Sequence, residues 1–420
     1  MSACGLDFGT SNTTLGTWRS DGPELVRLEG DEVTVPSAIF IEPSGAASVG
    51  RAAIEAYVDG QPGRLMRSLK SVLGRPLLDE TTPVGRRRLT FREIIGAYLS
   101  AVKGRAEEVA GRELDRVVHG RPVHFVDGDP NADRRAEDAL RAIAASVGFR
   151  EVSFEYEPIA AALDYERSID REEIALIADI GGGTSDFSIL RLRGDRERTG
   201  DRKTDILAND GIRVGGTDFD RLLSLRRVMP ALGLGSPTKR PGLDVPSSYF
   251  HDLATWSSIN RLYTPKIRRE VAEVKRDAER PELIGRLLAV LVEERGHLLA
   301  MEVEDAKIEL AGAQSTRVEL GWIEPKLSVS IDRPAFVAAT AMLAGRLHAT
   351  VLDCIRNAGL TPDSIDALFL TGGSTRLAHA RAAITAAVPK ARIVDGDTFG
   401  SVGLGLTVQA ARRYGSRREV

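Results

Sequence analysis

Residues 179–186 read Asp-Ile-Gly-Gly-Gly-Thr-Ser-Asp, and this stretch decides the fold. Apolar runs at 174–178 and 187–192 lead into it and out of it, which predicts a strand, a tight turn and a second strand. Three consecutive glycines let the backbone approach a ligand closely, so that several N–H groups can point at one anion. Acidic residues at both ends indicate a site that also handles a metal or orients water. Standing alone, the same stretch is equally typical of an ordinary glycine-rich hairpin loop.

The pattern recurs twice. In residues 5–18, Asp7, Gly9, Thr10 and Ser11 restate the aspartate, glycine, threonine and serine of the central stretch in shorter form. A third glycine turn, Leu-Phe-Leu-Thr-Gly-Gly-Ser-Thr-Arg, occupies residues 368–376. Three turns of one kind, placed early, centrally and late in the chain, predict two similar lobes that close on one ligand.

Composition excludes several classes of protein. The chain has 420 residues, more than the roughly 250–300 at which a single core stops growing, so two or more lobes are expected. A net charge of −3 gives no reason to expect nucleic acid as a partner. Cys4 and Cys354 lie in apolar surroundings and predict two reduced, buried thiols. His119 and His124 fall on opposite faces of a strand predicted at 117–126, so no histidine metal site is expected.

Targeting signals are not expected. Residues 1–7 lack a basic region followed by an apolar core, which argues against a signal peptide. The most apolar helical stretch, 283–292, contains Arg286 and is too short to span a membrane. We therefore expect a cytoplasmic protein with no membrane partner.

The chain between the turns predicts alternating helices and strands. Residues 33–41 alternate like a strand that Pro36 interrupts. Helices are predicted at 50–57, 91–109, 132–147, 267–280, 283–299, 301–310, 334–359 and 403–414, and paired strands at 316–320 and 327–331. Residues 224–300 are predicted to form a helical insertion, and 191–203 a charged loop.

Four charged residues have an ordinary structural interpretation when each is taken alone. Lys70 alone is typical of a solvated surface lysine, and Glu157, before Pro158, of an acid at a helix start. Glu304 and Lys307 are spaced as a helix-surface ion pair worth about 0.2–0.5 kcal/mol.

With these motifs in this order, the sequence resembles the nucleotide-binding domain of the 70-kDa heat-shock protein (DnaK-type) chaperones, in the actin-like ATPase superfamily. It is most similar to shortened bacterial relatives that carry the ATPase part alone. The resemblance runs from Leu6 to Ala411 and implies an α/β fold of two lobes, each a mixed β-sheet flanked by helices, with a nucleotide cleft between them.

The resemblance also implies the domain boundaries. The first lobe would comprise 1–170, with an outer subdomain at 37–116 and a C-terminal helix, 395–415, packing back on it. The second would comprise 171–394, with a helical outer subdomain at 224–311. The chain stops at Val420, where the family continues, so we expect no peptide-binding domain.

The resemblance assigns catalytic roles to four residues. Lys70 falls where the family carries its catalytic lysine and would position the γ-phosphate and the attacking water. Asp179 would orient that water, and Thr184 would meet the γ-phosphate. Glu157 matches the glutamate near the Mg²⁺ water shell, so that Asp7, Asp179 and Glu157 would hold the metal through water.

The same resemblance implies the nucleotide contacts. Its two phosphate loops and the glycine turn after them would bind the phosphates, and later residues would flank the adenosine. Ile308 and Ala311 stand where the family often has an arginine and a serine, so adenine would pack on Ile308. The predicted nucleotide-binding residues are Asp7, Gly9, Thr10, Ser11, Asn12, Gly181, Gly182, Gly183, Gly215, Gly216, Glu304, Lys307, Ile308, Gly372, Gly373, Ser374 and Arg376.

The implied function is that of a chaperone-like protein that binds ATP or ADP with Mg²⁺, hydrolyses ATP slowly and switches lobe conformation with nucleotide state. A client or co-chaperone protein is the implied partner. Two alternatives remain on the same fold: a scaffold protein that polymerises on ATP, and a small-molecule kinase. Lys70 and Thr184 favour hydrolysis over the kinase, and sedimentation with and without ATP would reveal a polymer.

Overall fold

A computed structural model describes residues 2–20, 22–84, 87–126, 128–166, 169–193, 205–395 and 400–415. Most of the predicted charged loop 191–203, the segment 396–399 of the predicted C-terminal region 395–415, and Val420 lie outside the described residues. The chain divides into two compact units. Unit 1 comprises Met1–Gly216, Gly345–Arg376 and Ala380–Val420, and unit 2 comprises Thr217–Ala344 and Leu377–His379.

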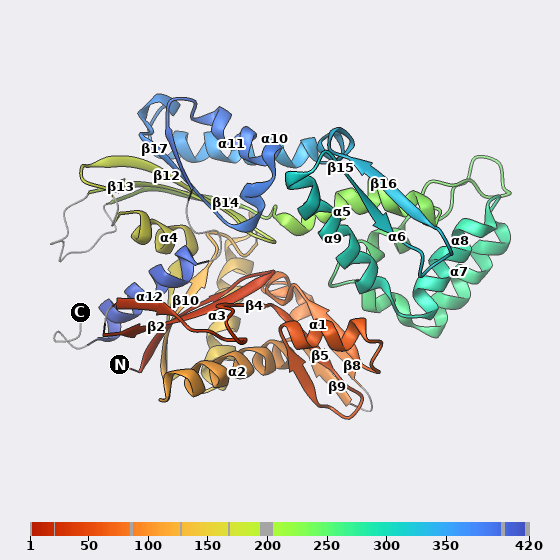
Figure 1. The fold of residues 1–420 in the computed structure, drawn as a ribbon, viewed down its shortest axis with the longest axis horizontal. Coiled ribbons are helices and arrows are strands. Elements are labelled where there is room, and N and C mark those ends of the chain that lie inside the picture. Colours follow the sequence, from red (N-terminus) through yellow and green to blue (C-terminus); the bar gives the residue numbers. More distant parts are fainter. Residues whose placement is uncertain are drawn as a thin grey trace. The chain divides into compact units, whose positions relative to one another are not determined.

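Unit 1 contains two sheets built in the same way (Figure 1). The first has the order β11-β10-β1-β2-β3, with β4 added on β2, and the second has the order β14-β13-β12-β17-β18. In each, an antiparallel hairpin and its next neighbour are followed by two parallel strands. The shared order fits the recurrence of the glycine hairpins in the sequence. The strands are β1 (Ala3–Phe8), β2 (Asn12–Arg19), β3 (Gly22–Leu25), β4 (Thr34–Pro36), β10 (Arg116–Arg121), β11 (Glu151–Tyr156), β12 (Glu173–Ile180), β13 (Ser185–Leu192), β14 (Ile206–Ile212), β17 (Ala367–Thr371) and β18 (Arg392–Asp395).

Alternating side chains give the first sheet two buried faces. From β1, Cys4, Leu6 and Phe8 join one apolar core with α2 (Phe91–Ala110) and α3 (Pro130–Ser146). Ala3, on the other face, joins a second core. This period-two pattern is the one expected of a strand covered on both sides.

The second core is shared by both sheets through α4 (Glu157–Glu166) and α12 (Ser401–Tyr414). Small residues let these two helices approach closely: a Cβ added at Gly405 would lie 1.9 Å from the Ala160 carbonyl oxygen. Because α4 and α12 join residues of both sheets in one core, they fix the two hairpins within a single unit. The remaining helices of this part are α1 (Arg51–Val58) and α11 (Ala378–Ala387).

Two short sheets complete unit 1. The first joins β5 (Ala38–Ile41), β6 (Ala47–Val49) and β7 (Arg64–Arg67), and the second joins β8 (Thr81–Val84) and β9 (Arg87–Thr90). The interruption predicted at Pro36 is confirmed, because β4 ends there and β5 begins at Ala38.

The strand predicted at 117–126 is too long. β10 ends at Arg121, directly before Pro122, which has no N–H to continue a ladder. His124 therefore lies outside the strand, and the argument from opposite faces fails. Both cysteines are buried and free, as predicted.

Unit 2 is mainly helical, with one two-stranded sheet. The helix predicted at 283–299 is wrong, because Glu294 adopts a left-handed backbone (φ 56°) between α8 and α9. Gly296 opens α9 and donates its N–H to the Tyr263 hydroxyl at 2.8 Å. The elements are α5 (Gly216–Leu223), α6 (Ser248–Leu253), α7 (Pro265–Asp277), α8 (Pro281–Val292), α9 (Gly296–Gly312), β15 (Ser315–Glu319), β16 (Ser328–Asp332) and α10 (Arg333–Asn357), within which the division between the units falls.

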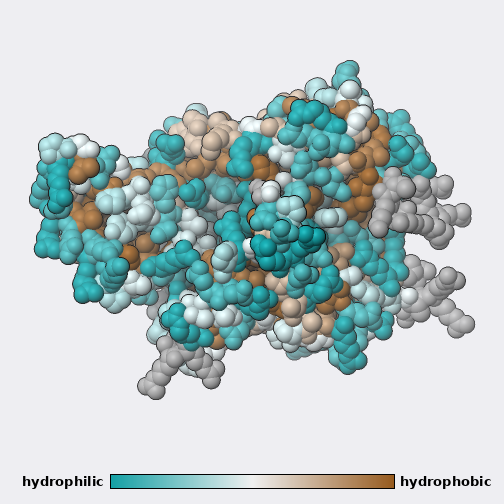
Figure 2. Space-filling view, turned by 180° about the vertical axis from the view of Figure 1, so that it is seen from behind, coloured by the Kyte–Doolittle hydropathy of each residue, from teal (hydrophilic) through white to brown (hydrophobic). Residues whose placement is uncertain are grey.

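Helix α10 is, by length and composition, apolar enough to cross a membrane. Buried residues recur along it at three- and four-residue spacing, as in a helix that covers a core: Phe336, Thr340, Leu343, Leu347 and Val351. Core helices pass the same test of length and composition. On the face drawn in Figure 2, hydrophilic side chains predominate, with hydrophobic ones scattered between them.

Candidate functional site

The turns of the two hairpins are closed by the same hydrogen bond. Gly9 N–H donates to the Asn12 carbonyl at 2.9 Å, and Gly181 N–H donates to the Thr184 carbonyl at 2.9 Å. The first turn is further fixed by Ser37, whose hydroxyl donates to the Gly9 carbonyl at 2.7 Å. The repeated sequence therefore folds into a repeated backbone.

The two turns lie against each other within unit 1. A Cβ added at Gly182 would lie 2.3 Å from Ser11 Oγ, and one added at Gly183 would lie 2.7 Å from Thr10 Oγ1. A side chain at either position would force the Ser11 or Thr10 side chain of the opposite turn to shift. The hydroxyl groups of one turn thus face the backbone of the other.

Two further glycine segments meet the second turn. The Gly181 carbonyl accepts hydrogen bonds from Gly216 N–H and from the Ser374 hydroxyl, both at 3.0 Å. A Cβ added at Gly215 would lie 2.5 Å from Gly183 N. The structure thus brings the early, central and late glycine turns together in one unit. Gly373 and Arg376, also in the late turn, are exposed.

Gly372 is the most constrained glycine of the late turn. Its φ is 84°, and a Cβ there would lie 2.4 Å from Asp179 Oδ1 and 2.5 Å from the Ile180 carbonyl oxygen. We expect Gly372→Ala to destabilise the protein by roughly 1–3 kcal/mol and to weaken nucleotide binding, because it combines backbone strain with a collision. Chemical denaturation and nucleotide titration measure the two effects.

Gly104→Ala is the matched control for that variant. Gly104 lies on the exposed side of α2, with no atom within 4 Å of an added Cβ, so alanine there should be neutral or stabilise by up to about 1 kcal/mol. Equal stability of the two variants would contradict the geometry of the late turn.

Lys70 and Glu157 form a buried ion pair. Lys70 lies in the short 3₁₀ helix Leu69–Val72 and is only 5% exposed, so its interpretation as a solvated lysine is wrong. Its ammonium donates to Glu157 Oε1, on the first residue of α4. Breaking such a pair leaves an uncompensated buried charge.

Three aspartates accompany this pair: Asp7 from β1, Asp179 from β12 and Asp186 from β13. Burial, and then the Glu157 charge, raise the pKa of Asp7 to about 7. The same two causes raise the pKa of Asp186 to about 7 and that of Asp179 well above its ordinary value. Burial lowers the pKa of Lys70, but the surrounding carboxylates outweigh it and the net shift is upward.

Asp186 was not among the predicted site residues. Its carboxylate accepts a hydrogen bond from Val123 N–H at 2.5 Å and one from the Thr184 side chain. The sequence could have indicated Asp186, because residues 179–186 carry an acidic residue at each end. The prediction assigned a role to Asp179 alone. Thr184 therefore lies beside a carboxylate.

The cluster is suited to a hydrated divalent cation. With all groups ionised, Asp7, Glu157, Asp179 and Asp186 exceed the single positive charge of Lys70 by three. Among the residues that the structure describes, no three acidic, histidine or cysteine side chains are placed to hold a metal directly. Mg²⁺ usually keeps several of its waters, so carboxylates acting through water fit this arrangement.

The predicted adenosine residues of α9 lie in unit 2. Lys307 is buried, so the surface ion pair predicted with Glu304 does not describe it. Its Nζ lies 2.9 Å from both carboxylate oxygens of Asp220 on α5. Glu304 is half-buried, and Ile308 is 58% exposed.

Double mutation can test the coupling between Lys307 and Asp220. Lys307→Met should destabilise the protein by about 3–5 kcal/mol, because it removes the ammonium that pairs with the buried Asp220 carboxylate. Replacing both, as Lys307→Met with Asp220→Leu, should recover much of that loss. Urea unfolding measures the free energy of unfolding of the two single variants and of the double variant. If the single effects simply add in the double variant, the two residues are not coupled.

Comparisons with known proteins agree on one family. The sequence model of the family described as Hsp70 protein matches residues 3–226 and 294–420. The chain is 28% identical over 442 aligned residues to a chaperone protein HscA homolog of Azotobacter vinelandii, covering 99% of this chain and 59% of that protein. It is 26% identical over 411 residues to the chaperone protein DnaK of Halobacterium salinarum, covering 96% and 55%. The chain thus spans less than two thirds of the length of these relatives.

Proposed function

Because the chain belongs to the Hsp70 family, we propose that it is a chaperone-type protein that binds ATP with Mg²⁺, hydrolyses it slowly and changes conformation with nucleotide state. Family membership confirms the predicted resemblance and the α/β actin-like ATPase fold. Members of this family are nucleotide-binding ATPases, which supports the general activity. The rate, the metal and the switch are proposals for this chain.

One observation carries the proposal. The Lys70–Glu157 pair is buried among Asp7, Asp179 and Asp186, which lie on the strands that flank two touching glycine turns. Phosphoryl transfer needs positioning and charge neutralisation more than covalent chemistry. A buried lysine, the backbone N–H groups of the two turns and carboxylates that hold water would supply both.

The proposed roles follow from this placement. The turns at 9–12 and 181–184 bind the phosphates through backbone N–H groups and the hydroxyls of Thr10, Ser11 and Thr184. Lys70 holds the γ-phosphate, and Asp179 and Asp186 orient water. When bound, Mg²⁺ neutralises phosphate charge, and Asp7, Asp179 and Glu157 hold its waters.

Adenosine contacts are proposed from two segments. Gly372 and Ser374 belong to the late turn, which packs against Asp179 and Ile180 through Gly372 and bonds the Gly181 carbonyl through Ser374. In unit 2, Glu304 and Lys307 would contact the ribose, and the exposed Ile308 would offer an apolar surface for adenine.

Partners and location are proposed from the family alone. Hsp70 chaperones in general bind client or co-chaperone proteins, so we propose a protein partner of that kind and a cytoplasmic location. No nucleic-acid or membrane partner is proposed.

Phosphate release from Mg·ATP, measured with and without a metabolite extract, tests the activity. Slow release that needs no acceptor supports the ATPase, whereas transfer only to an added metabolite would favour a kinase. Sedimentation with ATP serves as the second arm, because a pellet that forms only with ATP would favour a polymerising scaffold.

A further inference from the structure

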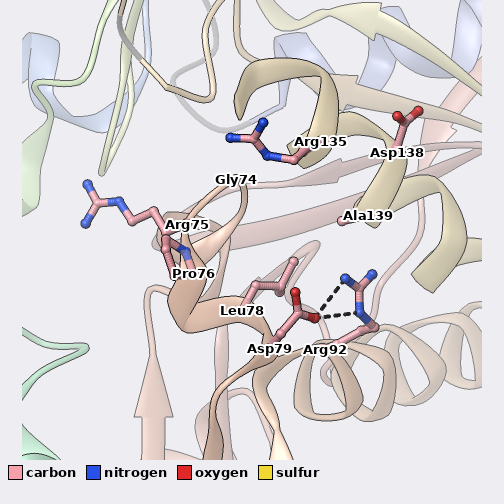
Figure 3. Close-up of a pocket in the computed structure, with 9 residues that line it drawn as sticks. All are labelled: Gly74, Arg75, Pro76, Leu78, Asp79, Arg92, Arg135, Asp138 and Ala139. Atoms are coloured by element: carbon pink, nitrogen blue, oxygen red, sulfur yellow. Dashed lines mark hydrogen bonds and ion pairs between the residues drawn. The ribbon is translucent and has the colours of Figure 1, made fainter. Parts of the chain in front are cut away.

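A pocket of about 430 Å³ lies in unit 1 (Figure 3). It is formed by the segment that follows Lys70, by Arg92 at the start of α2 and by one face of α3. No residue predicted to hold nucleotide lines it. Its volume falls within the roughly 300–1,000 Å³ of pockets that bind small molecules.

The charges of the pocket are only partly neutralised. Arg92 is paired with Asp79, whose Oδ1 lies 3.0 Å from Nη2 and 3.3 Å from Nε (Figure 3). Arg75 has no hydrogen-bond or ion-pair partner for its guanidinium among the described residues. Arg135 has only a distant contact, 3.9 Å from Nη2 to Asp129 Oδ2. In Figure 3 the guanidiniums of Arg75 and Arg135 both extend toward the left of the view, whereas the Asp138 carboxylate points the other way.

The rest of the lining adds apolar surface and one acceptor. Leu78 and Ala139 are buried and provide an apolar floor, next to Pro76. Asp138 has no ion-pair partner among the residues described, but its carboxylate points away from both guanidiniums in Figure 3. Guanidinium groups bind phosphates and carboxylates through paired N–H donors.

We propose that this pocket binds a small organic anion. Its phosphate or carboxylate group would lie on Arg75 and Arg135, and its short carbon body on Leu78 and Ala139. Phosphate and carboxylate share the same recognition by guanidinium, and the experiment below separates them.

The pocket is continuous with the segment that carries Lys70. Gly74 has a φ of 74°, and a Cβ there would lie 2.9 Å from the Ala132 carbonyl on α3, so the chain turns directly against that helix. Leu73 N–H donates to the Lys70 carbonyl at 3.2 Å. An anion that joins Arg75 to Arg135 would therefore tie the Lys70 segment to α3 and alter hydrolysis, a consequence that rests on the proposed function.

Calorimetry on the full chain tests the binding, with saturating Mg·ADP to occupy the nucleotide site. The probes are glycerol 3-phosphate, inorganic phosphate and succinate. We expect one-to-one binding of at least one probe with a Kd of roughly 1 mM or tighter. Arg75→Gln and Arg135→Gln should each weaken it about tenfold.

Arg134→Gln is the matched control, since Arg134 lies on the same helix but bonds Asn131 outside the pocket. No binding of any probe, or equal binding by Arg75→Gln and Arg134→Gln, would overturn the proposal. A preference for glycerol 3-phosphate or for succinate identifies the anionic group.

Phosphate release with and without the probe tests the coupling separately. A changed rate in the wild type that Arg75→Gln abolishes and Arg134→Gln retains is the expected result. Binding without any change of rate would contradict the coupling to Lys70, and a chain that binds the probe but never hydrolyses ATP would contradict the proposed function instead.

Discussion

Lys70→Ala is expected to reduce single-turnover ATP hydrolysis roughly 100-fold or more while nucleotide binding persists. The lysine is the only cation in contact with Glu157 among the described residues, and it is 5% exposed. In a site that excludes water, the positive charge of the lysine stabilises the negative charge that develops on the reacting phosphate. Rapid mixing with Mg·ATP, followed by phosphate detection, measures the loss.

A second buried lysine provides the control. Lys103 is 8% exposed and pairs with Glu107 at 2.5 Å on α2, outside the predicted nucleotide site. Lys103→Gln removes a buried ammonium of the same kind and should leave the rate of the folded protein unchanged. If both variants lose the same activity, or if Lys70→Ala retains the wild-type rate, Lys70 has no role in the chemistry.

Removal of Mg²⁺ is expected to abolish hydrolysis, and the stabilisation by Mg·ADP is expected to grow as pH rises from 6 to 8. The pKa values of Asp7 and Asp186 are raised to about 7, mainly by burial. A cation favours the ionised carboxylates, so binding must release protons below pH 7 and becomes more favourable above it. Thermal melting at several pH values measures the rise in melting temperature that Mg·ADP causes. This rise should be larger at pH 8 than at pH 6 by roughly 2 °C or more.

The metal-free protein should show the opposite trend. Between about pH 4 and pH 7 the folded state binds more protons than the unfolded chain, because unfolded aspartates ionise near pH 4. The contribution of Asp7 and Asp186 to stability is therefore present at low pH and is lost as pH rises through 7. Asp186→Asn should flatten both trends, and since nucleotide protonation is the same in both proteins, an unchanged pH dependence would contradict the assignment.

The repeated turns made much of the fold predictable. The sequence of residues 5–18 and 179–186 predicted two similar hairpins, and the two sheets of unit 1 have the same strand order. The predicted strand and helix boundaries were wrong where a single residue interrupted the local sequence pattern. Pro122 ended a strand that alternation alone would have continued, and a left-handed Glu294 divided a helix that periodicity made continuous.

Site geometry was less predictable than the fold. Lys70, Glu157 and Asp7 are separated by long stretches of chain, and nothing local to Lys70 distinguishes it from a surface lysine. Its burial depends on α4 and the hairpin strands, which only the folded chain brings together. The same is true of Asp220, which pairs with Lys307 across 87 residues.

The decisive measurement is phosphate release from Mg·ATP by the purified wild-type chain under single-turnover conditions. We expect stoichiometric binding followed by slow release of one phosphate per chain, without any acceptor. Tight binding without release would contradict hydrolysis, and failure to bind ATP at all would contradict the nucleotide site itself.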